Sequence, residues 1–126
     1  MANLSHKTHD VTIADLKAGD LTVALLMGPA NPDGSGVSEP SPVNGYARQP
    51  ITFGETERQG AASVIKNTNA IVFGPANPQG WATVSHLGLF DADGDLRAVS
   101  ALGTPRFAPL GDAISFAIGA VQFKFF

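Results

Sequence analysis

Cysteine is absent from this 126-residue chain, which excludes disulfide bonds, thiolate nucleophiles and cysteine-based zinc sites together. Charge is also sparse: charged residues make up 15% of the sequence, and the eight basic residues are scattered singly. Without a basic cluster there is no electrostatic footprint for a phosphate backbone. We therefore expect no nucleic acid among the partners of this protein.

Long apolar runs are missing as well. No stretch approaches the length of a membrane span, and the N-terminal "MANLSHKTHD" lacks the apolar segment of a secretory signal. We expect synthesis in a cytoplasm and no membrane partner. The hydrophobic fraction of 44% is nevertheless high enough to argue against disorder, and the length suits one packed domain.

Glycine and proline, 23 residues together, stand between short apolar runs, which is typical of many short strands. The Asp-Gly pair in "DADGD" predicts a hairpin, and no segment has a convincing helical period. The predicted strands are 20–27, 46–53, 61–66, 69–73, 81–90, 96–103 and one or two within 113–126. This pattern predicts an all-β fold, a single antiparallel β-sandwich or jelly-roll-like barrel of about seven to eight short strands.

The two ends of the chain differ in character. Residues 114–118 and 121–125 each alternate apolar side chains, but with opposite parity. Either a bulge or bend at Gly119 keeps one strand's apolar side inward, or a tight turn there separates two strands. In both cases the apolar C-terminus is expected to pack against the body.

Residues 1–19 are polar and mixed. We interpret them as an extended N-terminal arm, with a helical turn ending near Gly19 as the alternative, and residues 20–126 as the β-sandwich domain. The few apolar residues of the arm fit neither the strand period nor the helical period well. Because an arm would bind neighbouring subunits, they are candidate interface residues: Val11, Ile13 and Leu16.

The heptapeptide "GPANPDG" at Gly28 returns as "GPANPQG" at Gly74. The flanking sequences differ, so we interpret it as one strand-ending turn used twice. Neither copy is followed by the Lys-Ser/Thr of a phosphate-binding loop. The first copy opens a long loop, 28–42, of the kind that is often functional. Its prolines are further interface candidates: Pro29, Pro32, Pro40 and Pro42.

Polar residues that could carry chemistry are few. The "DADGDL" stretch at Asp91 lacks the glycine and glutamate positions of a calcium-binding EF-hand loop. His6 and His9 have no third metal ligand at usual spacing. His86 stands alone in a predicted strand, without a nucleophile elbow or an orienting acid. We therefore expect no catalytic residue, no metal and no cofactor, and we expect that the protein is not an enzyme.

Trp81 follows the second heptapeptide directly. It could stack on a sugar, together with Tyr46 and the glycine- and proline-rich loops, but a single tryptophan that opens a strand more often anchors a core edge or an interface. Trp81 is the last of the interface candidates.

The chain from Tyr46 onward resembles a family of short bacteriophage virion structural proteins, usually described as small tail-fibre or structural proteins. The resemblance covers about 46–126, and the N-terminal segment and the loop 28–43 depart from the pattern. It is carried by the stretches "YARQPITFG", "IVFGPA", "GWATVSHLGLFDADG", "LRAVSALGTPR" and "GDAISFAIGAVQF".

The resemblance implies a non-enzymatic component of the virion, made in the cytoplasm of a bacterial host. Its partners would be other virion proteins, either the major capsid protein or tail components. The chain has no long repetitive shaft and its size suits a surface-bound knob, so a capsid decoration or cement protein is the first hypothesis. A tail-fibre or tail-tip module, or a carbohydrate- or receptor-binding β-domain, is the alternative. Fibre proteins commonly trimerise, so we expect a homo-oligomer.

Overall fold

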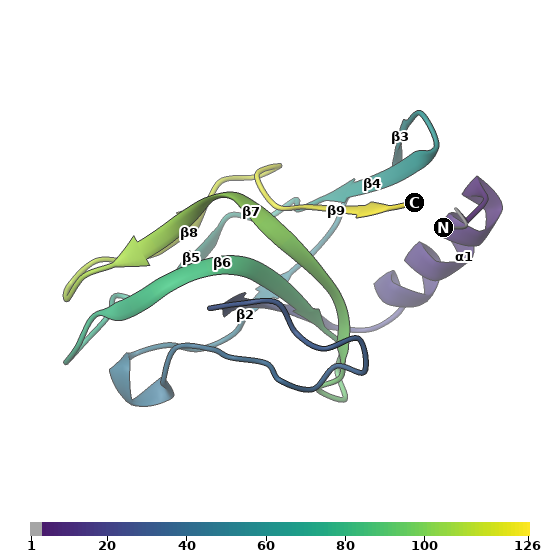
Figure 1. The fold of residues 1–126 in the computed structure, drawn as a ribbon. Coiled ribbons are helices and arrows are strands. Elements are labelled where there is room, and N and C mark those ends of the chain that lie inside the picture. Colours follow the sequence, from purple (N-terminus) through teal and green to yellow (C-terminus); the bar gives the residue numbers. More distant parts are fainter. Residues whose placement is uncertain (1–3) are drawn as a thin grey trace.

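A computed structural model describes residues 4–126 as one helix followed by nine strands (Figure 1). The elements in chain order are α1 (His6–Lys17), β1 (Leu21–Leu26), the short 3₁₀ helix η1 (Pro42–Asn44), β2 (Gln49–Ile51), β3 (Glu57–Gln59), β4 (Ala62–Lys66), β5 (Ile71–Phe73), β6 (Trp81–Phe90), β7 (Leu96–Ala108), β8 (Ile114–Phe116) and β9 (Gln122–Phe125).

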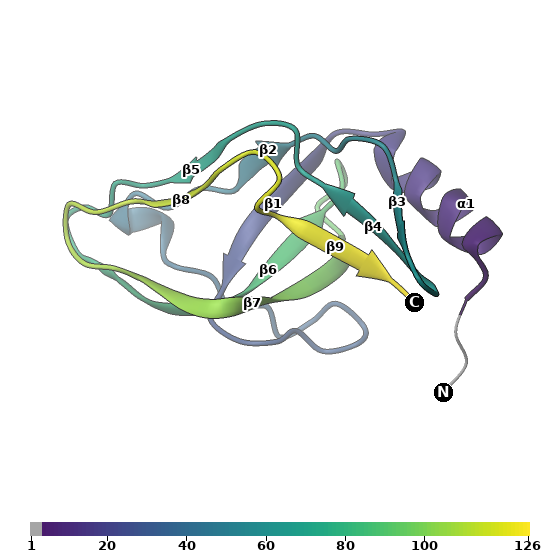
Figure 2. The same ribbon diagram turned by 90° about the horizontal axis from the view of Figure 1, so that it is seen from above.

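The strands form three antiparallel sheets with the orders β2-β1-β6-β7, β3-β4-β9 and β5-β8. The two smaller sheets face the four-stranded sheet across a shared hydrophobic core (Figures 1 and 2). The predicted all-β, sandwich-like fold is confirmed, and the sheets do not close into a barrel. Each sheet therefore keeps edge strands.

Strand β1 lies in the middle of the four-stranded sheet and is buried on both faces, as its apolar sequence predicts. Val23 and Leu25 point into the main core. Ala24 and Leu26 point to the opposite face, where Phe90 and the partly buried Val37 cover them. Val37 belongs to the proline-rich loop, so one role of this loop is to cover the outer face of β1.

Four aromatic rings meet at the centre of the core. Tyr46 stacks on Phe73 with ring centroids 6.1 Å apart, and Trp81 packs edge-on against Tyr46 at 5.8 Å. Phe116 packs edge-on against Phe73 at 6.4 Å. Edge-to-face and offset contacts of this kind stabilise beyond the area they bury. They join the β5-β8 sheet to β6.

The predicted hairpin between β6 and β7 is confirmed, and β6 spans the predicted residues 81–90. Strand β7 continues to Ala108, beyond the predicted end at 103. Strand β3 was not predicted, because all of its residues are polar and exposed and it has no apolar alternation. At the C-terminus a turn separates β8 from β9. Gly119 adopts a left-handed φ of +82° there, and Ile118 is exposed to solvent.

The prediction of an extended N-terminal arm is wrong, because residues 6–17 form helix α1, which packs on the body. Ser5 caps its first turn by accepting a hydrogen bond from the Thr8 backbone N–H. The buried residues of the helix are His9, Ile13 and Leu16, which recur at intervals of four and three, the helical spacing. One of these three is a histidine, so a pattern of apolar residues alone does not show the stripe.

Polar contacts fasten α1 to the sheets. Asp10 pairs with Arg58 of β3 at 2.6 Å, and Asp15 pairs with Arg97 of β7 at 2.7 Å. Exposed ion pairs contribute little each, so burial of the apolar residues carries most of the stabilisation.

Both heptapeptides follow the end of a strand, β1 and β5, as predicted, but they adopt different conformations, so they are not one turn geometry used twice. In the second copy the Gly74–Pro75 and Asn77–Pro78 peptide bonds are cis and Gly74 has a φ of +107°, none of which occurs in the first copy. Ala76 is fully buried in the second copy, whereas Ala30 of the first is partly exposed. Tertiary packing, rather than local sequence, selects each conformation.

Candidate interaction surfaces

The proline-rich loop is tied to the sheet by a polar cluster of Glu39, Tyr46 and Arg48. The Tyr46 hydroxyl donates to Glu39 Oε2 at 2.5 Å and accepts from the buried Leu25 N–H at 3.1 Å. Arg48 donates to Glu39 Oε1 at 2.7 Å, and its guanidinium lies 3.7 Å from the centre of the Phe90 ring. The cluster borders a cavity of about 500 Å³ beside the loop.

The charges of this cluster compensate one another. Burial raises the pKa of Glu39, but hydrogen bonds from Arg48 and Tyr46 outweigh it and hold the pKa below its ordinary value. Burial, and then the hydrogen bond to Glu39, raise the pKa of Tyr46 well above its usual range. At neutral pH the carboxylate is ionised and the phenol protonated. Their polar groups are used within the protein, so the cluster fits a structural clamp.

Replacing Tyr46 by phenylalanine is expected to lower the free energy of unfolding by about 1–3 kcal/mol, because the buried Leu25 N–H loses its acceptor. Chemical denaturation measures the change. A Glu39→Gln variant is the matched control, since its amide oxygen can still accept the Tyr46 hydrogen bond.

Because the pKa of Glu39 is lowered in the folded protein, its ionised carboxylate stabilises the fold above the ordinary pKa of 4.5. This stabilisation is lost as the pH falls below that value.

Glu39→Gln should therefore be less sensitive to acid than the unmodified protein below about pH 4.5. A Tyr46→Phe variant as stable as the unmodified protein would contradict the clamp.

Three of the interface candidates lie inside the protein. Ile13 and Leu16 belong to the core, with 2% and 3% of their surface exposed. Trp81 is 3% exposed, and its Nε1 donates to the Asn44 carbonyl at 2.9 Å. Their proposed interface role is corrected accordingly, since burial in their own chain leaves no surface for a partner. With Tyr46 also buried, the sugar-stacking interpretation of Trp81 is wrong and the core-anchor interpretation holds.

The other candidates are divided between surface and interior. Pro40 is a fourth buried candidate, so its proposed interface role is corrected in the same way, whereas Val11, Pro29, Pro32 and Pro42 are exposed. The exposed prolines lie on a loop that is held in place, since Met27 N–H donates to the Ser38 carbonyl at 2.8 Å. These four residues stay predictions of an interface.

The polar candidates are explained by local structure. Asp91, Asp93 and Asp95 bring ligand atoms within 4.8 Å of one another in the β6–β7 turn. Asp91 Oδ1 accepts hydrogen bonds from the backbone N–H groups of Asp93 and Asp95, each at 3.0 Å. The bond from Asp95 is the main cause that lowers the pKa of Asp91. This arrangement is the predicted hairpin turn, with its carboxylates at the surface.

Two of the histidines, His6 and His9, are neighbours, with ring centroids 5.8 Å apart, whereas His86 belongs to β6. His9 is fully buried and its Nδ1 lies 2.7 Å from Ser63 Oγ, whereas His6 contacts the Gly60 carbonyl at 3.1 Å. His86 Nδ1 lies 2.7 Å from the hydroxyl of its sequence neighbour Ser85. In the described part of the chain no carboxylate hydrogen-bonds to a histidine, so none of the three has an orienting acid.

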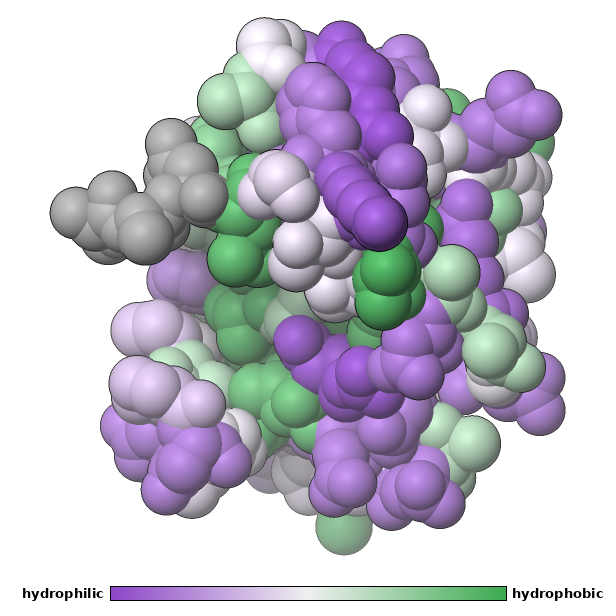
Figure 3. Space-filling model, turned by 90° about the vertical axis from the view of Figure 1, so that its right-hand side faces the viewer, coloured by the Kyte–Doolittle hydropathy of each residue, from purple (hydrophilic) through white to green (hydrophobic). Residues whose placement is uncertain are grey.

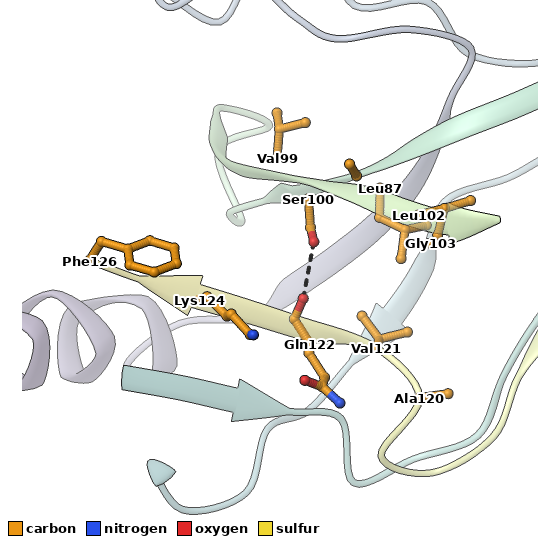
Figure 4. Close-up of a pocket in the computed structure, with 11 residues that line it drawn as sticks. Leu87, Val99, Ser100, Leu102, Gly103, Ala120, Val121, Gln122, Lys124 and Phe126 are labelled. Atoms are coloured by element: carbon orange, nitrogen blue, oxygen red, sulfur yellow. Dashed lines mark hydrogen bonds between the residues drawn. The ribbon is translucent and has the colours of Figure 1, made fainter. Parts of the chain in front are cut away.

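A groove lies between β7 and β9 (Figure 4). It has a volume of about 610 Å³, and Ser100 Oγ donates to the Gln122 carbonyl across it at 3.2 Å. Figure 3 shows hydrophobic surface gathered in and around a hollow on the side of the molecule that carries α1 and the C-terminus. Sequence reasoning missed this groove, because β7 and β9 become neighbours only in the folded sandwich.

Among known protein families, a family model described as "Podophage GP4 fiber I protein gp80" matches residues 8–124. The chain belongs to this family of phage fibre proteins. The resemblance to short phage virion structural proteins is thereby confirmed. The matched range also runs through most of α1 and the loop 28–43. No curated protein matches the chain in sequence.

Membership in the fibre family makes the chain a structural protein of the bacteriophage virion, where it associates with other virion components. None of the helices among residues 4–126 has both the length and the apolar character needed to span a lipid bilayer.

Proposed function

We propose that this chain is a non-enzymatic module of a phage tail fibre, which joins other virion proteins through its outer surface. The observation that carries the proposal is the match to a fibre protein family along residues 8–124, nearly the whole chain. The match includes the helix, the loop and every strand up to most of β9, so the whole sandwich is the unit that the family shares.

The absence of a converging polar site in the described structure supports a role without catalysis. The ionisable cluster of Glu39, Tyr46 and Arg48 is satisfied internally. His86 has only Ser85 as a side-chain hydrogen-bond partner among residues 4–126. A catalytic base needs an oriented partner and a substrate position within reach, and neither accompanies these groups.

A capsid decoration or cement protein is the second candidate. The compact sandwich, without a repetitive shaft in its 126 residues, favours a unit that sits on a surface. In either role we expect a homo-oligomer, with a trimer as the arrangement common among fibres. Repeated copies would multiply modest contacts into firm attachment.

Deleting the gene from the phage separates the two candidates. A fibre module predicts that particles lacking the chain adsorb to host cells at least about tenfold more slowly, while their genome is released at an unchanged temperature. A cement protein predicts the reverse, because it stabilises the shell and leaves adsorption unaffected. Unchanged adsorption together with a lower release temperature would therefore refute the fibre role.

A further inference from the structure

Two of the seams where the edges of the sheets meet differ in how they are closed. At the seam between the end of β2 and the segment before β5, Thr68 N–H donates to the Thr52 carbonyl at 2.8 Å. The Asn69 side chain accepts from Thr52 N–H at 3.0 Å. Across the seam between β7 and β9, the described residues form only the Ser100–Gln122 hydrogen bond. This second seam is open.

Both strands along the open seam are edge strands. β7 ends the four-stranded sheet and β9 ends the three-stranded sheet, and in the described chain no strand pairs with their outer edges. An edge strand presents main-chain N–H and C=O groups that have no strand partner. Another extended segment complements such an edge best, because it can join the sheet as a further strand.

The seam also offers apolar surface. Its floor includes Leu87 and Val121, which belong to the core and are 3% and 1% exposed. Its rim carries the partly buried Leu102 of β7, which points toward the groove, and Phe126 after β9, which is 60% exposed (Figure 4). An extended segment lying along the seam would cover the rim residues and direct alternate side chains toward the floor. Burial of such side chains stabilises binding roughly in proportion to the apolar area removed from water.

The rim carries one positive charge. Lys124 lines the groove beside Gln122 and Phe126, and none of the ion pairs among the described residues involves it. The cations Arg48, Arg58 and Arg97 all pair with carboxylates of this chain. An acidic residue of a partner would pair with Lys124. The place of Lys124 in the groove therefore indicates where the partner strand carries a negative charge.

We propose that the seam between β7 and β9 binds an extended strand of a neighbouring virion protein. The strand carries apolar side chains at alternate positions, which face the groove, and an acidic residue that pairs with Lys124. This inference rests on the proposed role as a fibre module and names the surface through which that module is attached.

The test uses particles from a phage that lacks the gene, mixed with purified full-length protein, and measures the amount that co-sediments. Phe126→Ser removes the exposed apolar ring from the rim of the groove, and we expect at least about a tenfold drop in affinity. Lys124→Glu removes the complementary charge, and we expect a similar drop. Val72→Lys is the matched control, because Val72 is 52% exposed on β5 outside the groove. It should bind like the unmodified protein.

Hydrogen exchange provides a second readout that does not depend on substitutions. Backbone amides of residues 98–104 along β7 should exchange at least about tenfold more slowly in the particle-bound protein than in the free protein, because a partner strand would pair with them. Unchanged exchange in this segment would overturn the proposal.

The remaining outcomes are distinguishable. If the unmodified protein fails to bind particles, the proposed function fails with the inference. If it binds and both seam variants bind equally well, the seam is overturned and the fibre role stands. If Phe126→Ser instead dissociates an oligomer of the purified protein while particle binding persists, a second copy occupies the seam and the assignment to another virion protein is overturned.

Discussion

Replacing Trp81 by alanine is expected to lower the free energy of unfolding by about 3–5 kcal/mol, the usual cost of truncating a buried aromatic side chain. Trp81 is 3% exposed and packs edge-on against Tyr46. Its removal would leave a cavity at the centre of the core and would leave the Asn44 carbonyl without its donor. Urea or guanidinium denaturation of the purified protein measures the loss.

Trp81→Phe is the matched control for this experiment. It retains a ring in the core and loses the Nε1–H group, so it should cost less than Trp81→Ala. A surface residue that stacks on a sugar would behave differently, since its truncation would leave stability within about 0.5 kcal/mol of the unmodified protein. That result for Trp81→Ala would contradict its place in the core.

Removing residues 1–18 is expected to lower the free energy of unfolding by about 3–6 kcal/mol, because burial of one large aliphatic side chain contributes about 1.5–3 kcal/mol. Two such side chains, Ile13 and Leu16, leave the core with the helix. The deletion also removes the hydrogen-bond partner of Ser63 and the ion-pair partner of Arg58. Thermal and chemical denaturation of the truncated protein measure the loss.

Val11→Ala is the matched control on the same helix. Val11 is 65% exposed, so its truncation should change stability by less than about 0.5 kcal/mol. A free arm would make the deletion equally harmless. If the truncated domain unfolds at the same denaturant concentration as the full chain, α1 is not part of the folded body.

Strands with strong apolar patterns could be predicted from the sequence. β1 is apolar on both faces and lies in the middle of its sheet, and β6 and β7 flank an Asp-Gly turn. Local signals and tertiary packing agree at these positions. β3 lacks such a signal, because its residues are polar and exposed, and they contact β4 through main-chain pairing and polar side chains such as Glu57, which pairs with Lys66.

The helix and the interface residues were harder to predict for a related reason. The buried stripe of α1 includes His9, which becomes an interior residue because Ser63 supplies a hydrogen-bond partner on another element. Trp81 likewise becomes a core residue because Tyr46 and the Asn44 carbonyl meet it from distant parts of the chain. No pattern along the sequence contains these contacts.

The open seam depends entirely on topology. β7 and β9 end different sheets, and only the arrangement of those sheets places their edges side by side. Alternation of apolar residues correctly indicates two strands here. It carries no information on which edges stay unpaired, and those edges are what a partner strand would recognise.

Cryo-electron microscopy of the virion at side-chain resolution tests the central claim most directly. We expect density for this sandwich, with α1 packed on β4, in the tail fibre, where it should repeat with the symmetry of the fibre. Density for the same fold spread over the head shell with icosahedral symmetry, and absent from the fibre, would contradict it.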